Sequence, residues 1–177
     1  KRRGRLQLVN DDAAADEFLS AHEQLDRAGF AHYEVSSYAQ PGRRARHNSL
    51  YWSGAEILGL GAGACSFWQP RAGLGVRFGN HRSVNRYLAA RPAPSIAPLA
   101  ADPLVAAYEE QGPAALAVDR IWLGLRTADG VPLAMLRGRE AVIARLDVGG
   151  LVRIEGGRLM PTLRGLLLAD EVGRMLM

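Results

Sequence analysis

The sequence is short of cysteine and of long apolar runs, and each shortage argues against a class of protein. Cys65 is the single cysteine among 177 residues, so no disulfide can form within the chain, which is typical of a cytoplasmic protein. One thiol also excludes a zinc or iron–sulfur site built from several cysteines of this chain alone. No stretch of about 18 apolar residues exists, which argues against a transmembrane helix. The basic N-terminus, KRRGRLQLVNDD, lacks the apolar core of a signal peptide.

Lysine is also nearly absent, since Lys1 is the only one and arginine supplies the remaining positive charge. The formal net charge is +4, and the charge is unevenly spread. Between Gln40 and Ala101 a single acid, Glu56, stands against eight arginines, at positions 43, 44, 46, 71, 77, 82, 86 and 91. A phosphate, a carboxylate or a nucleic-acid backbone would be attracted to this segment. A solvated basic face, from a genome that favours arginine codons, is the alternative.

The composition, 48% hydrophobic and 23% charged, is that of a globular protein with one domain or two small ones. Residues 12–29 have apolar side chains at helical spacing, with N-cap candidates at residues 10–12 and a stop at Gly29. Residues 30–38 are predicted to form a strand, so that the two resemble one αβ unit of a parallel sheet. A buried strand running into glycines is expected at 55–68, another at GVRFGN, and a helix at 81–91. The proline-rich segment 91–103 predicts a domain boundary, which divides the chain into 1–100 and 101–177.

The second part has the order of elements of a winged helix. A helix near 113–127 and a short one begun by Pro132 are expected first. A helix at 139–148, the strand LVRIE, the turn Gly156-Gly157, the strand RLMPT and a helix at 162–176 then follow. Such domains often bind DNA through one helix. The helix EAVIARL offers only Arg139 and Arg145 as basic residues and no Asn, Gln, Ser or Lys, so nucleic acid is disfavoured as a partner.

The stretch Gly59-Leu60-Gly61-Ala62-Gly63-Ala64 has the residue types of a G-x-G-x-x-G/A dinucleotide-binding turn. The surrounding sequence does not support that fold. That fold needs an acidic residue about 20 positions later for the ribose, and no Asp or Glu occurs from Ile57 to Ala101. What remains is a glycine-rich strand end that lets a ligand approach the backbone closely, or glycines that merely permit tight packing.

The stretch RRARHNSLYWSG, residues 43–54, crowds three arginines, His47, Asn48, Tyr51 and Trp52 into twelve positions. It has neither a clean helical nor a clean strand pattern. It is interpreted either as an irregular loop packed for structural reasons or as a binding site for a flat anionic ligand.

The order of segments resembles the C-terminal half of one family. The strings YEVSSYAQPG, RHNSLYW, LGLGAGACSF, LGLRTADGV and GGRLMPTLRGLLLAD are similar to the oxygen-independent coproporphyrinogen III oxidase family, and most similar to its HemW branch of heme chaperones. The most specific markers are the His-Asn-x-x-Tyr-Trp string at 47–52 and the glycine turn at 59–64. Met160-Pro161-Thr162 departs from the Leu-Thr pair that is usual near the C-terminus. The Tyr51-Trp52 pair favours the chaperone branch over the oxidase branch.

The resemblance implies an α/β fold: the end of a radical S-adenosylmethionine partial (β/α) barrel, followed by a small helical or winged-helix C-terminal domain. It implies S-adenosylmethionine and a [4Fe–4S] cluster in the full-length protein. The family's three cluster cysteines, spaced C-x-x-x-C-x-x-C, do not occur in this chain. The alternative activity within the family is oxidative decarboxylation of coproporphyrinogen III in porphyrin biosynthesis.

The resemblance also assigns ligands to residues. Gly61, Gly63, Ala64 and Cys65 are expected beside S-adenosylmethionine, and the 47–52 string beside the substrate. Heme is a planar apolar ring with two propionates and an iron that accepts imidazole nitrogen. We therefore expect His47 as an axial ligand of heme iron or, alternatively, as a hydrogen-bonded structural histidine. Tyr51 or Trp52 would stack on the ring, next to Asn48, and arginines of the string would pair with propionates, Arg46 first among them, with Arg43 and Arg44. The expected partners are heme and apo-hemoproteins such as respiratory cytochromes, and a peripheral membrane contact is compatible with this.

Overall fold

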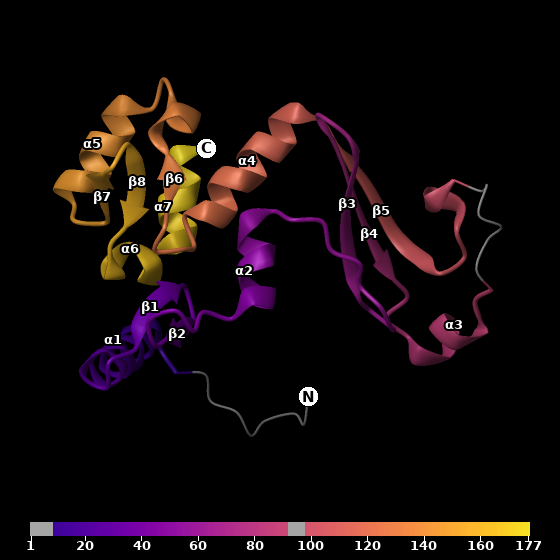
Figure 1. Ribbon diagram of the computed structural model, residues 1–177, viewed down its shortest axis with the longest axis horizontal. Helices are drawn as coiled ribbons and strands as arrows, with labels where there is room; N and C mark the ends of the chain where they lie inside the picture. The colour runs from indigo at the N-terminus through magenta and orange to yellow at the C-terminus, as the bar shows by residue number, and fades with distance from the viewer. Residues whose placement is uncertain (1–8, 92–97) are drawn as a thin grey trace. The chain divides into compact units, whose positions relative to one another are not determined.

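The computed structural model describes residues 9–91 and 98–177, which form helices and short antiparallel strands (Figure 1). They divide into two compact units. The first comprises the described residues up to Arg46 together with Gly124–Met177, and the second is His47–Leu123. This division differs from the boundary expected at residue 100. Residues 92–97 of the proline-rich segment lie outside the described residues, and the strands on either side of that segment belong to one sheet. The assignment of 1–100 and 101–177 to two family domains stays a prediction.

The second unit is built on a three-stranded antiparallel sheet in the order β3-β4-β5 (Figure 1). Its strands are β3 (Cys65–Arg71), β4 (Leu74–Asn80) and β5 (Val105–Gln111). Its other elements are α2 (Arg46–Ser53), α3 (Val84–Ala89), η1 (Leu99–Ala101) and α4 (Pro113–Gly124). Leu116 of α4 lies against Gly75 of β4, where an added Cβ would come within 2.7 Å of Leu116 Cδ2. The strand predicted at GVRFGN and the helix predicted within 81–91 are confirmed.

The segment 55–68 is only partly a strand. Strand β3 begins at Cys65, after the glycines, and Ile57 joins the sheet through a single antiparallel bridge to Phe67. The glycines thus form a turn before the strand, where the sequence predicted that they would follow one.

The first unit opens with α1 (Asp11–Arg27), and the predicted helix is confirmed. Asn10 caps it, with its side-chain oxygen accepting from Ala13 N–H at 2.8 Å. The single strand predicted at 30–38 is wrong. Those residues form a hairpin of β1 (Ala31–Glu34) and β2 (Ser37–Ala39), whose turn is stabilised by Ser36 N–H donating to the Glu34 carboxylate at 3.2 Å. All strand pairs among the described residues are antiparallel, so this helix and hairpin do not form the predicted parallel αβ unit.

The remainder of the first unit confirms the winged-helix order. Its elements are β6 (Val131–Pro132), η2 (Leu133–Leu136), α5 (Glu140–Val148), β7 (Val152–Glu155), β8 (Arg158–Pro161), α6 (Leu163–Leu167) and α7 (Ala169–Leu176). The turn Gly156-Gly157 has φ values of 55° and 74°, as a type I′ hairpin requires. The strands order as β6-β8-β7, so the wing has a third strand that the sequence did not predict. The predicted helix 162–176 is broken at Leu168 into α6 and α7, and the helix predicted to reach residue 127 ends at Gly124.

The deepest burial lies in the winged part of the first unit. The side chains with less than 2% exposure are Leu125, Leu136, Leu146, Leu159, Leu176, Val131, Val152 and Val172. The winged part therefore has a core of its own. Both units also expose apolar side chains: Leu58 and Leu60 of the second unit are 71% and 81% exposed, and Val148 of α5 is 90% exposed.

Two histidines join α1 to its hairpin. The His32 and Tyr38 rings stack with centroids 4.2 Å apart, and the His22 ring lies 5.6 Å from that of His32. Burial lowers the pKa of His32 below its usual value, and the neighbouring His22 lowers it further, while backbone groups of Val35 and Glu34 and the Glu34 charge oppose the shift. His32 Nε2 is buried without a hydrogen-bond partner among the described residues.

These contacts predict that acidification destabilises the packing of α1 on its hairpin. The pKa of His32 is depressed in the folded state, so the stabilisation is complete above the unfolded value of about 6.5 and declines as pH falls below it. We expect His32→Phe, which keeps a stacking ring and cannot titrate, to flatten the fall in unfolding free energy between about pH 7 and pH 5. Urea unfolding at several pH values checks this. An equal slope in His32→Phe and the wild type would contradict the prediction.

Candidate functional site

The crowded stretch RRARHNSLYWSG is helical in its second half. Residues Arg46–Ser53 form α2, which corrects the interpretation of the whole stretch as an irregular loop. Four-residue spacing places His47 and Tyr51 on one face of the helix, and their rings meet edge to face with centroids 5.1 Å apart. Arg46, His47 and Asn48 are exposed.

A cavity of about 480 Å³ lies within the second unit, between α2, the sheet and α4. This volume is within the range of about 300–1,000 Å³ that small-molecule sites occupy. Three predicted site residues line it: Tyr51, Trp52 and Cys65. The other predicted site residues, Arg46, His47, Asn48, Gly61, Gly63 and Ala64, are not among its lining residues. The structure therefore brings one end of the heme string and one end of the glycine turn to the same cavity.

Most of the cavity wall is apolar, and one ion pair interrupts it. Phe67 of β3 and Leu116 and Leu123 of α4 contribute to the apolar surface. The Arg77 guanidinium lies 2.7 Å from an Asp119 carboxylate oxygen and 5.7 Å from the centre of the Phe67 ring. The same Asp119 oxygen accepts from the Gln111 side-chain amide at 2.8 Å. A flat apolar ligand with a few polar substituents suits such a wall.

These wall residues could not be predicted from the sequence. Arg77 alternates with apolar neighbours in GVRFGN, a pattern that marks a half-exposed strand, but no local signal pairs it with Asp119, 42 positions later. The pairing exists because β5 lies beside β4 and leads directly into α4.

The glycine turn is held by hydrogen bonds from the sheet. Gly59 N–H donates to Ser66 Oγ at 2.9 Å, and Gly63 N–H donates to the His81 carbonyl at 2.9 Å. The Asn80 amide donates to the carbonyls of Gly61, at 2.9 Å, and Gly59, at 3.4 Å. Gly61 and Gly63 have φ values of 105° and 74°, so the turn needs glycine at both positions.

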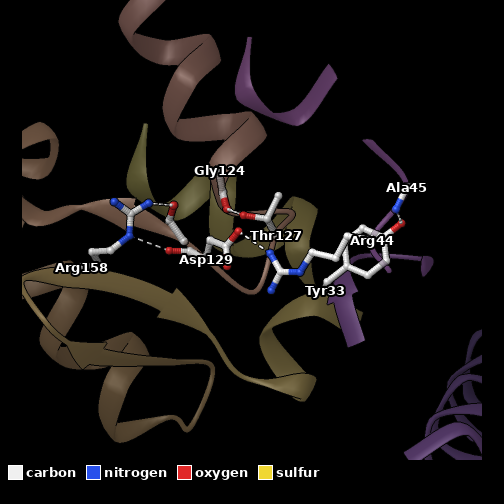
Figure 2. A network of polar contacts seen from close by, with 8 residues as sticks. Tyr33, Arg44, Ala45, Gly124, Thr127, Asp129 and Arg158 are labelled. Atoms are coloured by element: carbon white, nitrogen blue, oxygen red, sulfur yellow. Dashed lines mark hydrogen bonds and ion pairs between the residues drawn. The ribbon is translucent and has the colours of Figure 1, made fainter. Parts of the chain in front are cut away.

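Arg44 has an ion-pair partner within the first unit. Figure 2 shows its guanidinium paired with the Asp129 carboxylate, at 2.7 Å, near Arg158, which donates to the Asp129 carbonyl. Tyr33 Oη accepts from Ala45 N–H at 3.3 Å. Arg46 has no hydrogen-bond or ion-pair partner in the part of the chain that the structure describes, so its charge is available.

The candidate recognition helix, α5, has few basic side chains of its own. Ile143 and Leu146 of α5 are buried, and the Arg139 side chain donates to the Leu176 carbonyl, so Arg145 is the basic residue that α5 itself presents.

Within residues 9–91 and 98–177, no three His, Cys, Asp or Glu side chains gather in a way that could hold a metal ion. Over the same residues, no helix combines the length and apolar character needed to cross a membrane.

Comparison with curated proteins finds relatives that match the whole chain. Heme chaperone HemW of Mycobacterium tuberculosis is 37% identical over 181 residues, covering 99% of this chain and 42% of the relative. Heme chaperone HemW of Escherichia coli is 44% identical over 57 residues, 32% of this chain and 15% of the relative. A Danio rerio protein, radical S-adenosyl methionine domain-containing protein 1, mitochondrial, is 34% identical over 74 residues, 42% of this chain and 17% of the relative. No protein-family model matches the chain.

A solved structure shares the fold. The radical SAM enzyme coproporphyrinogen III oxidase (HemN) of Escherichia coli aligns with a TM-score of 0.65 at 12% identity, covering 98% of this chain and 43% of that one. The chain thus spans about two fifths of the length of the M. tuberculosis relatives and of this structure. The predicted fold class, a mixed α/β portion of the radical SAM oxidase fold, is confirmed. The chain belongs to the oxygen-independent coproporphyrinogen III oxidase family of radical S-adenosylmethionine proteins, as a HemW-like C-terminal portion.

Proposed function

We propose that the full-length protein is a heme chaperone and that this chain supplies its heme site. The observation that carries the proposal is the position of α2: Tyr51 and Trp52 line an apolar cavity, and His47 contacts Tyr51 from one helical turn away. The names of the relatives, heme chaperones in several bacteria, support the same function.

The residues fit the chemistry of heme as a cargo. Phe67, Leu116 and Leu123 give the cavity an apolar wall for the porphyrin ring, and Trp52 offers an aromatic face. His47 is exposed at the end of the helix that lines the cavity, so its imidazole can supply an axial nitrogen to the iron. Arg46, next to it, is exposed and pairs with a propionate, while Asn48 offers an amide nearby.

The full-length protein would also carry S-adenosylmethionine and a [4Fe–4S] cluster, as the family does. The cluster needs three cysteines and this chain has one, so its ligands come from elsewhere in the protein. The turn from Gly59 to Ala64, with Cys65 at the cavity wall, would lie beside S-adenosylmethionine through Gly61, Gly63, Ala64 and Cys65. When bound, S-adenosylmethionine and the cluster together supply radical chemistry. The residues of this chain position and enclose the ligand.

The recipients of heme would be apo-hemoproteins, respiratory cytochromes among them. Delivery would take place in the cytoplasm or at the cytoplasmic face of the membrane. Coproporphyrinogen oxidation is the less supported alternative. The solved oxidase is only 12% identical to this chain, which shows a common fold, whereas the relatives at 37% identity are named heme chaperones.

The axial role of His47 predicts a change in the heme spectrum. We expect the full-length protein to take up ferric heme with a sharp Soret band, and His47→Ala to shift and weaken that band, because the iron loses an imidazole nitrogen. An absorption titration with hemin measures this. His81→Ala, a histidine outside α2 that does not line the cavity, is the matched control and should behave as the wild type. An unchanged Soret band in His47→Ala would exclude His47 as the axial ligand.

A further inference from the structure

The glycine turn owes its shape to two side chains of the neighbouring strands. Asn80, at the end of β4, donates both hydrogens of its amide toward the turn: one to the Gly61 carbonyl at 2.9 Å and one to the Gly59 carbonyl at 3.4 Å. Ser66 of β3 is 5% exposed and accepts from Gly59 N–H at 2.9 Å. The Asn80 backbone also donates to the Ala64 carbonyl at 2.9 Å, which fixes Asn80 itself against the end of the turn.

These bonds fix one side of the turn and leave the other side open. The Gly59 and Gly61 carbonyls are directed to Asn80, whereas the N–H groups of Leu60, Gly61 and Ala62 have no hydrogen-bond partner in the described residues. Leu60 is 81% exposed, so this edge is accessible. Unpaired N–H groups at an open glycine turn can receive polar atoms of a ligand, provided that the backbone is held in one conformation.

The turn also packs tightly against the start of the sheet. A Cβ added to Gly59 would lie 2.3 Å from the Cys65 carbonyl oxygen, so the turn folds back tightly on the start of β3. Glycines at 59, 61 and 63 leave the segment little side-chain packing of its own. The side-chain contacts from Asn80 and Ser66, together with the backbone bond from Gly63 N–H to the His81 carbonyl, therefore hold its conformation.

We propose that Asn80, assisted by Ser66, is a positioning residue for S-adenosylmethionine binding at the Gly59–Ala64 turn. The inference rests on the proposed function, which puts S-adenosylmethionine beside this turn. Asn80 acts through the backbone: its amide holds the carbonyls away from the ligand and so presents the free N–H edge to it. The specific consequence is that loss of the Asn80 amide weakens ligand binding without removing any group that contacts the ligand.

The test compares S-adenosylmethionine affinity in variants of the full-length protein with a reconstituted cluster. We expect Asn80→Ala and Asn80→Asp to raise the dissociation constant, measured by equilibrium dialysis, by about 10- to 100-fold, as removal of an orienting residue does at metal sites. Asn80→Asp is the more specific test of the two. The carboxylate has the same shape as the amide but would repel the carbonyl oxygens of Gly59 and Gly61. Asn80→Gln keeps the amide and should recover part of the affinity. Asn85→Ala, an exposed asparagine on α3, is the matched control and should bind as the wild type.

Further readouts separate positioning from folding. Hydrogen exchange at Gly59–Ala64 should accelerate in Asn80→Ala, and Ser66→Ala combined with it should show non-additive losses of affinity, because both side chains hold one turn. Hemin binding should stay at the wild-type level in the Asn80 single variants, because Asn80 does not line the cavity. An unchanged dissociation constant in a folded Asn80→Ala protein would overturn the inference. Absence of S-adenosylmethionine binding by the wild type would instead overturn the proposed function, and the inference with it.

Discussion

Gly130→Ala is expected to destabilise the winged part of the chain by about 3–5 kcal/mol, a large share of a small domain's stability. Gly130 is buried and has a φ of 61°, in the left-handed region where an alanine is strained. An added Cβ would lie 2.0 Å from the Leu159 carbonyl oxygen and 2.7 Å from Met160 Cα. Both neighbours are backbone atoms of β8, which pairs with β6 immediately after Gly130, so no side-chain movement relieves the contact.

Gly138 separates the two causes of this effect. Its φ is 83°, but nothing lies within 4 Å of an added Cβ, so Gly138→Ala carries the backbone strain without the collision. We expect it to cost about 1 kcal/mol. Urea unfolding followed by circular dichroism measures both variants. Equal losses would mean that the collision with β8 contributes nothing and that the close approach of this loop to the sheet is not a constraint on stability.

The winged part could be predicted in detail because its signals are local. Gly156-Gly157 between two short apolar-alternating runs defines a hairpin, and the flanking helices have their own periodicity. Its third strand, β6, could not be predicted, because Val131–Pro132 is only two residues long and pairs with β8 across 25 intervening positions. The break at Leu168 was also missed, since the apolar pattern continues through it.

The N-terminal hairpin shows why the parallel unit was the wrong prediction. FAHYEVSSY reads as one strand because aromatic and β-branched residues run through it. The chain reverses at Val35 and Ser36, where Val35 N–H donates to the Arg126 carbonyl, and Ser36 N–H to its neighbour Glu34. A contact with a residue 91 positions away decides the turn, and no window of local sequence contains it.

The candidate site was predictable in its residue types and only partly in its geometry. The sequence did not predict that Arg46–Ser53 is a helix, so it did not show that His47 and Tyr51 share one helical face, and the arginines at 44 and 46 looked equivalent. Both are exposed in the structure, but Arg44 pairs with Asp129, whereas Arg46 has no hydrogen-bond or ion-pair partner among the described residues. The cavity itself arises from β3, β4, β5 and α4 together, which no single motif encodes.

Ala107→Trp is expected to lower heme affinity by at least about tenfold, or 1.4 kcal/mol, by filling the cavity with an indole ring. Ala107 is an exposed residue of β5 and one of the cavity's lining residues. It pairs across the sheet with Gly79, which pairs with Cys65, so the three residues form one row at the cavity wall. The Cys65 sulfur lies 3.7 Å and the Ala107 Cβ 3.9 Å from the position of a Cβ on Gly79, which puts them on one face. Tryptophan also suits a strand, so the fold should tolerate the change.

Ala106 provides a matched control, because it is the adjacent exposed alanine of β5 and does not line the cavity. Ala106→Trp introduces the same side chain in the same strand. Any loss that it shares with Ala107→Trp reports damage to the strand, and the difference between the two variants reports occupation of the cavity.

A hemin titration of the full-length wild type, Ala107→Trp and Ala106→Trp, followed at the Soret band, tests the central claim most directly. If the cavity beside α2 binds heme, the wild type and Ala106→Trp should saturate at one heme per chain with similar affinity, and Ala107→Trp should bind at least about tenfold more weakly. Equal heme affinity in Ala107→Trp and the wild type would contradict the claim that this cavity is the heme site.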